Sequence, residues 1–170
     1  VVEAMRAEFQ ARLDQARAPL KDPATIVALT TRVSLREALD NAEWHDFLRL
    51  AGLDTTRVLL QAEKQRHADI EWGARSGRFK VDDVDYAQRL ILGMLEHVVR
   101  DIQAGSLTRA AVDDTGRYIM RMLGLPDVVA KALVQSPLPP LAAPARRLLV
   151  AGASGSPAAH IVAMSQVTPV

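Results

Sequence analysis

The hydrophobic positions of this chain recur at helical spacing, most continuously between residues 82 and 104. This stretch has no proline and is long enough for about six helical turns. One face carries an apolar stripe of Val84, Ala87, Ile91, Met94, Leu95, Val98 and Ile102. The neighbouring face carries a second row of Tyr86, Leu90, Gly93 and His97. A helix that is apolar over most of its circumference needs cover on two sides, so the pattern predicts a second copy of the chain on the second face. Cover by the C-terminal residues of the same chain is the alternative.

The same periodicity predicts further helices and no β-strand, because the β-branched residues occur singly within helical periods. These helices are expected over residues 1–17, from 23 onward, and over 43–50, 54–76, 109–123 and 126–134. Asp22 and Pro23 form the start signal of the second helix, since Asp suits an N-cap and Pro suits the first helical position. The short connection at 105–108 predicts that the helix after it returns antiparallel. The expected fold class is therefore all-α, an antiparallel helix bundle.

The character of the chain changes after Gln135. Four prolines follow within ten residues, and Arg146 and Arg147 are almost the only charges in the remainder. We therefore expect one domain over residues 1–134 and a Pro/Ala/Gly-rich extension over residues 135–170. The first helical pattern begins at the first residues without an N-cap or an initiator methionine. We expect from this that a preceding segment is missing.

Composition and charge limit the partners of the chain. The chain is 49% hydrophobic and 24% charged, which permits a buried core, and its net charge of +1 gives no field for holding a phosphate backbone. It has no cysteine, which excludes disulfide and thiolate chemistry. No apolar run approaches the ~18 residues that cross a bilayer, and no signal-peptide pattern opens the chain. We expect a cytoplasmic protein without a membrane partner.

Several polar side chains occur on helix faces that also carry apolar stripes. An apolar cavity with a few convergent polar groups is typical of small-molecule sites. The candidate ligand-binding residues are Arg32, Arg36, Trp44, Phe47, Leu59, Glu63, Arg66, His67, Ile70 and Met94. They suit a small, apolar or aromatic organic effector, with an anionic group for an arginine. The alternative is an internal ion-pair cluster, in which the arginine stems lie along the core and Glu63 binds one head group.

Other patterns point only weakly to chemistry. Glu63, His67 and Glu71 are spaced four residues apart and could hold a metal, but such rows are more typical of charge pairs on exposed helices. His97 and Asp101 have the spacing of a hydrogen-bonded pair at an interface. The chain has no Gly-x-Ser-x-Gly sequence, and its glycine-rich run at 152–156 lacks the lysine and the strand of a phosphate loop. We therefore predict no catalytic residue, no metal and no cofactor, and a protein that is not an enzyme.

The order of the helices and several short sequences resemble the C-terminal regulatory domain of TetR-family transcriptional regulators over about residues 1–134. These sequences are GRF at 77–79 followed by acidic residues, LILGMLEHVVR at 90–100, the Ala/Asp-rich return helix, and MLGLP at 122–126. The opening VVEAMRAEF looks like the helix that follows the helix-turn-helix of that family. The resemblance implies an all-α effector-binding and dimerisation domain. It also implies that the N-terminal helix-turn-helix, which reads operator DNA, is absent from this chain.

The resemblance further implies a homodimer, because the family usually pairs its last two long helices with those of a partner in a four-helix bundle. Here those helices are expected over 82–104 and 109–123. The candidate interface residues are Tyr86, Leu90, Gly93, His97, Tyr118 and Met122. The implied function is a ligand-responsive transcriptional regulator, expected to be a repressor, that binds operator DNA only through its missing N-terminal domain. The alternative is a helical small-molecule-binding or interaction module without a DNA role.

Overall fold

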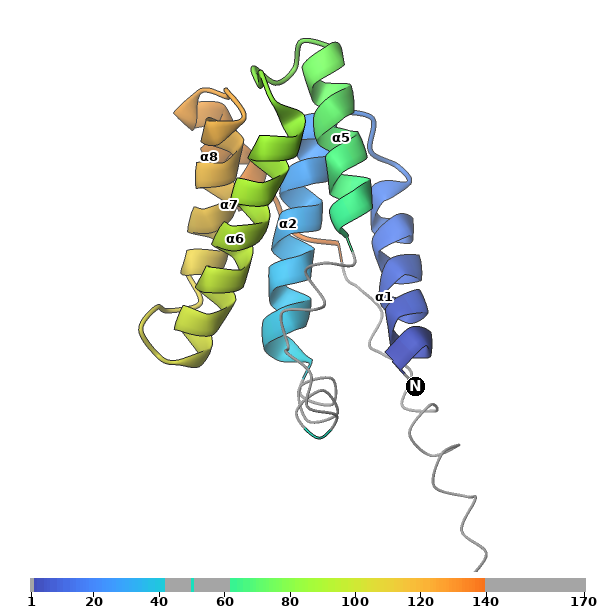
Figure 1. Cartoon of the computed structure of the whole chain (residues 1–170), viewed down its shortest axis with the longest axis vertical. Helices are drawn as coiled ribbons and strands as arrows, with labels where there is room; N and C mark the ends of the chain where they lie inside the picture. The colour runs from blue at the N-terminus through green and yellow to red at the C-terminus, as the bar shows by residue number, and fades with distance from the viewer. Residues whose placement is uncertain (1, 42–49, 51–61, 140–170) are drawn as a thin grey trace, which may run out of the picture.

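The computed structural model of the chain describes residues 2–41, 50 and 62–139, which form a helix bundle (Figure 1). Its helices are α1 (Val2–Arg17), α2 (Pro23–Asp40), α5 (Glu63–Arg75), α6 (Val84–Gln103), α7 (Ala111–Met122) and α8 (Asp127–Gln135). No strand occurs within these described ranges. The predicted all-α fold class is confirmed, and the helix ends differ from the predicted ones by only a few residues. The helix expected over 43–50 and the first part of that expected over 54–76 fall outside the described residues, apart from Leu50.

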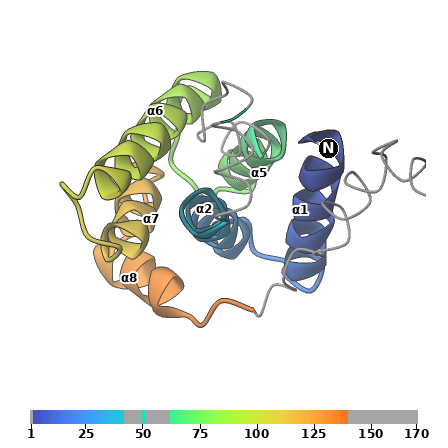
Figure 2. The same ribbon diagram turned by 90° about the horizontal axis from the view of Figure 1, so that it is seen from below.

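The centre of the bundle is α2, which contacts every other described helix (Figure 2). Thirteen of its 18 residues are buried, and they include polar as well as apolar side chains. The apolar periodicity of the sequence is instead most continuous over 82–104, which forms α6. In the structure α6 covers one side of α2 and buries one face, whereas α2 is enclosed on nearly all sides.

Two apolar clusters hold the bundle together. The larger lies between α2, α5, α6, α7 and α8, and the buried side chains that these helices contribute include Val27, Leu35, Ile70, Ile91, Leu95, Ile119, Met120 and Ala130. The smaller joins α1 to α2 through Phe9, Leu13, Leu29, Val33 and Ala62. The helix α1 is thus attached to a separate cluster from the one that contains α6.

The ends of the helices follow from local sequence signals. The Asp22 side chain accepts a hydrogen bond from the Thr25 backbone N–H at 3.1 Å, and Pro23 starts α2, as predicted. Gly124 has a φ of +94° and lies against Lys80, whose backbone N–H donates to the Leu123 carbonyl at 2.9 Å. This bond joins the turn before α6 to the end of α7.

The helices α6 and α7 run antiparallel side by side, as the short connection between them predicted (Figure 1). Asp83 caps α6 by accepting from the Tyr86 backbone N–H at 2.9 Å. None of the helices that the structure describes is long and apolar enough to cross a membrane.

Candidate functional site

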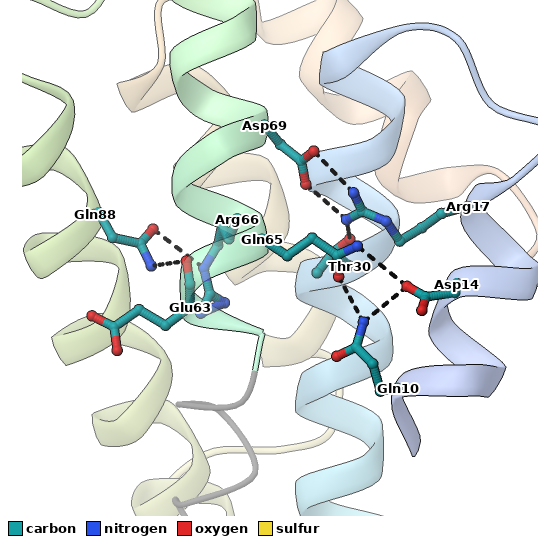
Figure 3. Close-up of polar contacts among 9 residues, drawn as sticks. All are labelled: Gln10, Asp14, Arg17, Thr30, Glu63, Gln65, Arg66, Asp69 and Gln88. Carbon is teal, nitrogen blue, oxygen red and sulfur yellow. Dashed lines mark hydrogen bonds and ion pairs between the residues drawn. The ribbon is translucent and has the colours of Figure 1, made fainter. Parts of the chain in front are cut away.

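A polar interior lies on both sides of α5, which is inserted between α1, α2 and α6 (Figure 3). The sequence of α5 is mostly polar, yet Arg66, Asp69, Ile70 and Gly73 are buried. Because helix positions three and four residues apart share a face, these residues point into the bundle. Two of the four carry charge, so their partners decide what the interior can do.

Arg66 is fully buried on the side of α5 that faces α6. Its Nε donates to Gln88 Oε1 at 3.4 Å, and Gln88 Nε2 donates to the Glu63 carbonyl oxygen at 3.2 Å. Burial lowers the pKa of Arg66 to about 10, although the negative charges of Glu63 and Asp69 act in the opposite direction.

The opposite side of α5 is joined to α1 by a buried ion pair. Arg17 NH1 and NH2 donate to the two carboxylate oxygens of Asp69 at 2.7 and 2.9 Å, and NH1 also donates to Thr30 Oγ1 at 2.9 Å. Both side chains are largely buried. A bidentate arginine–carboxylate pair fixes direction as well as distance, so α1, α2 and α5 are held in one arrangement at this point.

A second polar contact between α1 and α5 lies nearer the start of α5. Gln10 Nε2 donates to Gln65 Oε1 at 2.9 Å, and both amides donate to Asp14 Oδ1 (Figure 3). In addition, Arg12 NH2 bonds to Glu37 Oε1 at 2.7 Å and links α1 to the far part of α2. The attachment of α1 thus combines a small apolar cluster with directional polar bonds.

Two buried hydroxyl groups on α2 have no hydrogen-bond partner among the described residues: Thr31 Oγ1 and Ser34 Oγ. Both residues are fully buried, and a buried hydroxyl without a partner costs about 1–3 kcal/mol. The two residues are three positions apart and so share a face. Their neighbours on that face, Val27 and Leu35, pack in the cluster that contains residues of α5 and α6. The hydroxyl groups therefore lie on a face of α2 that packs into the larger apolar cluster.

The structure brings together part of the predicted ligand-binding set. Arg66 and Ile70 are buried on α5, Glu63 is half-buried in its first turn, and Met94 packs from α6 against the larger cluster. His67 is at the edge, where its Nε2 lies 2.5 Å from Asp85 Oδ1. Glu63, Arg66, His67 and Ile70 therefore lie on α5, and Met94 lies on α6, the helix that packs against it.

Two other members of that set lie elsewhere. Arg32 is buried on the α7 side of α2, where Nε donates to Asp113 Oδ1 and NH1 to the Ser136 carbonyl oxygen, each at 2.8 Å. Arg36, one turn later, is exposed. The predicted Trp44, Phe47 and Leu59 lie outside the described residues.

Gln88, Thr31 and Ser34 did not enter the predicted ligand-binding set. A signal for each was present in the sequence, because these polar residues occur inside the apolar periods of their helices. Single polar residues in such periods are also common at the edges of helices. Only the packing distinguishes the two situations.

The second apolar row of α6 is on the surface. Tyr86 and Leu90 are 62% and 44% exposed, Tyr118 on α7 is 57% exposed, and a Cβ at Gly93 would meet nothing within 4 Å. His97 is exposed and lies 3.3 Å from Asp101. Beside Tyr118 and the half-buried Met122, an open concavity of about 690 Å³ extends over the turn between α7 and α8. The dimer interface expected here remains a prediction.

The part of the chain that the structure describes contains no candidate metal site. No three histidine, aspartate or glutamate side chains gather there closely enough to hold an ion. Of the row Glu63, His67 and Glu71, the last is exposed and His67 contacts Asp85.

Comparison with known proteins gives a family and a fold. Residues 22–136 match the family described as tetracyclin repressor-like, C-terminal domain. RolR, in a crystal structure with resorcinol, has 24% sequence identity to this chain. The match covers 83% of this chain and 70% of the RolR chain, with a TM-score of 0.67. RolR crystallised without ligand has 26% sequence identity to this chain. That match covers 82% of this chain and 71% of the RolR chain, with a TM-score of 0.65. A search of curated proteins found no match.

The matched residues contain α2, α5, α6, α7 and α8, and thus the larger apolar cluster and the buried Arg66. These helices also occur in the order on which the sequence resemblance to TetR-family regulatory domains was based. The chain therefore belongs to the family of tetracyclin repressor-like C-terminal domains, the regulatory part of TetR-type transcriptional regulators.

Proposed function

We propose that this chain is the effector-binding and dimerisation domain of a TetR-type repressor that leaves its operator when a small organic molecule binds between α2, α5 and α6. Membership of the family implies a small-molecule effector and a dimer. Regulators of this family are generally not enzymes. The observation that carries the proposal is the fully buried Arg66, together with two buried hydroxyl groups that have no partner among the described residues.

These polar groups are costly for a core that serves only stability. Replacing a buried charge by apolar side chains of similar volume is often neutral or stabilising. The predicted alternative was an internal ion-pair cluster in which Glu63 binds an arginine head group. A buried ion pair does occur, but it joins Arg17 and Asp69. It does not explain Thr31 and Ser34, whose buried hydroxyl groups have no partner among the described residues. Buried polar groups of this kind favour a site that a ligand completes.

The proposed site consists of residues from the three helices α2, α5 and α6. They are Thr31, Ser34, Glu63, Arg66, His67, Ile70, Gln88 and Met94. Arg32 is better explained as a link between α2 and α7, given its bond to Asp113. RolR was crystallised with resorcinol, and we propose an effector of similar size for this chain.

The proposed response to the effector passes through α5. This helix carries Arg66 on the α6 side and Asp69, bonded to Arg17, on the α1 side. An effector that draws Arg66 toward itself shifts α5, and the ion pair transmits the shift to α1. In the family resemblance α1 follows the DNA-reading domain. The effector lowers operator affinity by the difference between its affinities for the two arrangements, and by no more.

Native mass spectrometry of the purified chain tests this function, with and without added resorcinol. We expect a dimer that carries a bound organic molecule. The variant Arg66→Leu is expected to lose that molecule, whereas Arg117→Leu, which removes a surface bond to Asp127, is expected to keep it. A dimer that binds resorcinol and no co-purified molecule also supports the proposal.

A chain that carries no molecule and takes up no resorcinol contradicts it. Operator binding separates the regulator from a helical binding module without a DNA role. We expect the full-length cytoplasmic protein, which includes the DNA-reading segment, to bind a DNA site upstream of its own gene. Loss of that complex on addition of the bound molecule identifies a repressor.

A further inference from the structure

We propose that the residues after α8, Ser136 to Pro139, form a strap that fixes the position of α1 and thereby raises operator affinity. These residues leave the end of α8 and run toward α1 (Figure 2). The effect on operator DNA rests on the proposed function, whereas the hold on α1 does not. The strap contains none of the residues of the proposed effector site.

The strap begins at a buried anchor on α2. Arg32 NH1 donates to the Ser136 carbonyl oxygen at 2.8 Å, and Arg32 Nε donates to Asp113 Oδ1 on α7 at the same distance. The Arg32 side chain is only 6% exposed. Because a guanidinium presents its donors in a fixed fork, Arg32 sets the position of Ser136 relative to both α2 and α7.

The sequence of the strap makes it stiff. Pro137 and Pro139 have fixed φ angles, and each disfavours the helical conformation of the residue before it. Ser136 accordingly has a φ of −59° and a ψ of 136°, values that end α8 and start an extended course. Proline-rich segments act as semi-rigid spacers, whereas glycine-rich ones behave as flexible coils. The strap therefore connects its anchor with its far end at a nearly constant distance.

The far end of the strap packs where α1 is attached to the bundle. Leu138 is half-buried and packs against the smaller apolar cluster. That cluster contains Phe9 and Leu13 of α1 and Leu29 and Val33 of α2. Among the described residues it has no member from α6, α7 or α8. Leu138 thus brings the chain that leaves α8 into contact with the cluster that holds α1.

The strap connects two sides of the central helix. The helices α7 and α8 pack on one side of α2 and α1 on another, and the strap passes between these sides (Figure 2). Moving α1 away from α2 therefore disturbs the packing of Leu138 or pulls Ser136 from Arg32. A chain without this restraint occupies more arrangements of α1, and the fraction that can bind DNA falls accordingly.

Hydrogen–deuterium exchange of the purified chain tests the hold on α1. Leu138→Ala removes the apolar contact, so exchange of the backbone amides over residues 9–14 is expected to become about fivefold faster or more, with exchange in α7 unchanged. Leu133→Ala is the matched control, because Leu133 is a half-buried leucine of α8 that packs against the larger cluster. This control is expected to leave exchange in α1 unchanged.

Two results of the exchange experiment overturn the inference. Exchange in α1 that is unchanged in Leu138→Ala shows that the strap does not hold this helix. Equal acceleration in Leu138→Ala and Leu133→Ala shows a general loss of stability and no specific hold.

Operator binding by the full-length protein tests the consequence of the hold. Leu138→Ala is expected to weaken binding to the DNA site by about threefold or more, while Leu133→Ala keeps the affinity of the unmodified protein. Faster exchange in α1 without a loss of operator affinity overturns the regulatory role of the strap. An unmodified protein that binds no such site contradicts the proposed function, and the exchange experiment still decides whether the strap holds α1.

Discussion

Three buried hydroxyl residues that lie close together on α2 differ in their hydrogen bonding. Thr30 Oγ1 accepts a hydrogen bond from Arg17 at 2.9 Å. Thr31 and Ser34 are equally buried, yet their hydroxyl groups have no partner in the described chain. The first belongs to the attachment of α1 and the other two to the proposed effector site. Stability measurements can separate these roles without any ligand.

Replacing the unpartnered hydroxyl groups is expected to stabilise the ligand-free chain. Thr31→Val and Ser34→Ala each remove a buried group that costs about 1–3 kcal/mol, so we expect each to raise the free energy of unfolding by about 1 kcal/mol. Thr30→Val is the matched control, and it is expected to lower that free energy by a similar amount because it leaves Arg17 without its hydroxyl partner. Urea denaturation measures all three. A loss of stability in both Thr31→Val and Ser34→Ala contradicts the assignment.

At the scale of the element, the start of α2 depends on one carboxylate. Partial burial of Asp22 acts to raise its pKa, but hydrogen bonds from Arg78 and Thr25 outweigh this effect and lower the pKa below 3.8. A carboxyl group whose pKa is lowered on folding stabilises the native state above the unfolded pKa. That contribution is lost as the pH falls through the folded value.

We therefore expect Asp22→Ala to destabilise the chain at pH 7 by about 1 kcal/mol. This figure is typical for the loss of an N-cap, and the half-exposed bond to Arg78 adds little because solvent screens it. The difference from the unmodified chain should shrink as the pH drops below 3.8. Asp82→Ala serves as the control, because Asp82 is an exposed carboxylate in the turn before α6. A difference that is constant between pH 7 and pH 3 contradicts the role of charge.

The elements were predictable where local sequence decides them. The cap at Asp22 and Pro23 depends on neighbouring residues only, and the sequence indicated it correctly. The central place of α2 was not predicted, because its burial depends on how five other helices pack around it. Arg32 and Arg36 show the same limit at the candidate site. They are one turn apart, yet one is buried against Asp113 and the other is exposed. Helical spacing gives the direction of a side chain and not its depth.

At the scale of the whole molecule, α6 contributes both to the buried core and to an exposed apolar face. Leu95 and Ile91 of α6 are buried in the core, whereas Leu90 and Tyr86 on the neighbouring row are exposed. Exposed rows of this kind are typical of interfaces. A dimer through α6 and α7 would place the second copy next to the helix that carries Gln88, and thus next to the proposed effector site.

The last prediction tests that dimer with two leucines of nearly equal exposure. Leu90 is 44% exposed on the second row of α6, and Leu107 is 40% exposed in the turn between α6 and α7. Leu90→Glu places a charge in the expected seam, where desolvation is costly, so we expect the dissociation constant of the dimer to rise by about 100-fold or more. Leu107→Glu adds the same charge outside the two helices, so it is expected to leave the dimer intact.

Sedimentation velocity over a range of protein concentrations measures both variants, and circular dichroism confirms that each is folded. A dimer that dissociates only in Leu90→Glu supports the four-helix interface through α6 and α7. If the two variants dissociate equally, net charge and not position controls association. An unmodified chain that is monomeric at every concentration rules the interface out. The C-terminal residues of the same chain are then the alternative cover for the exposed row of Tyr86, Leu90 and His97.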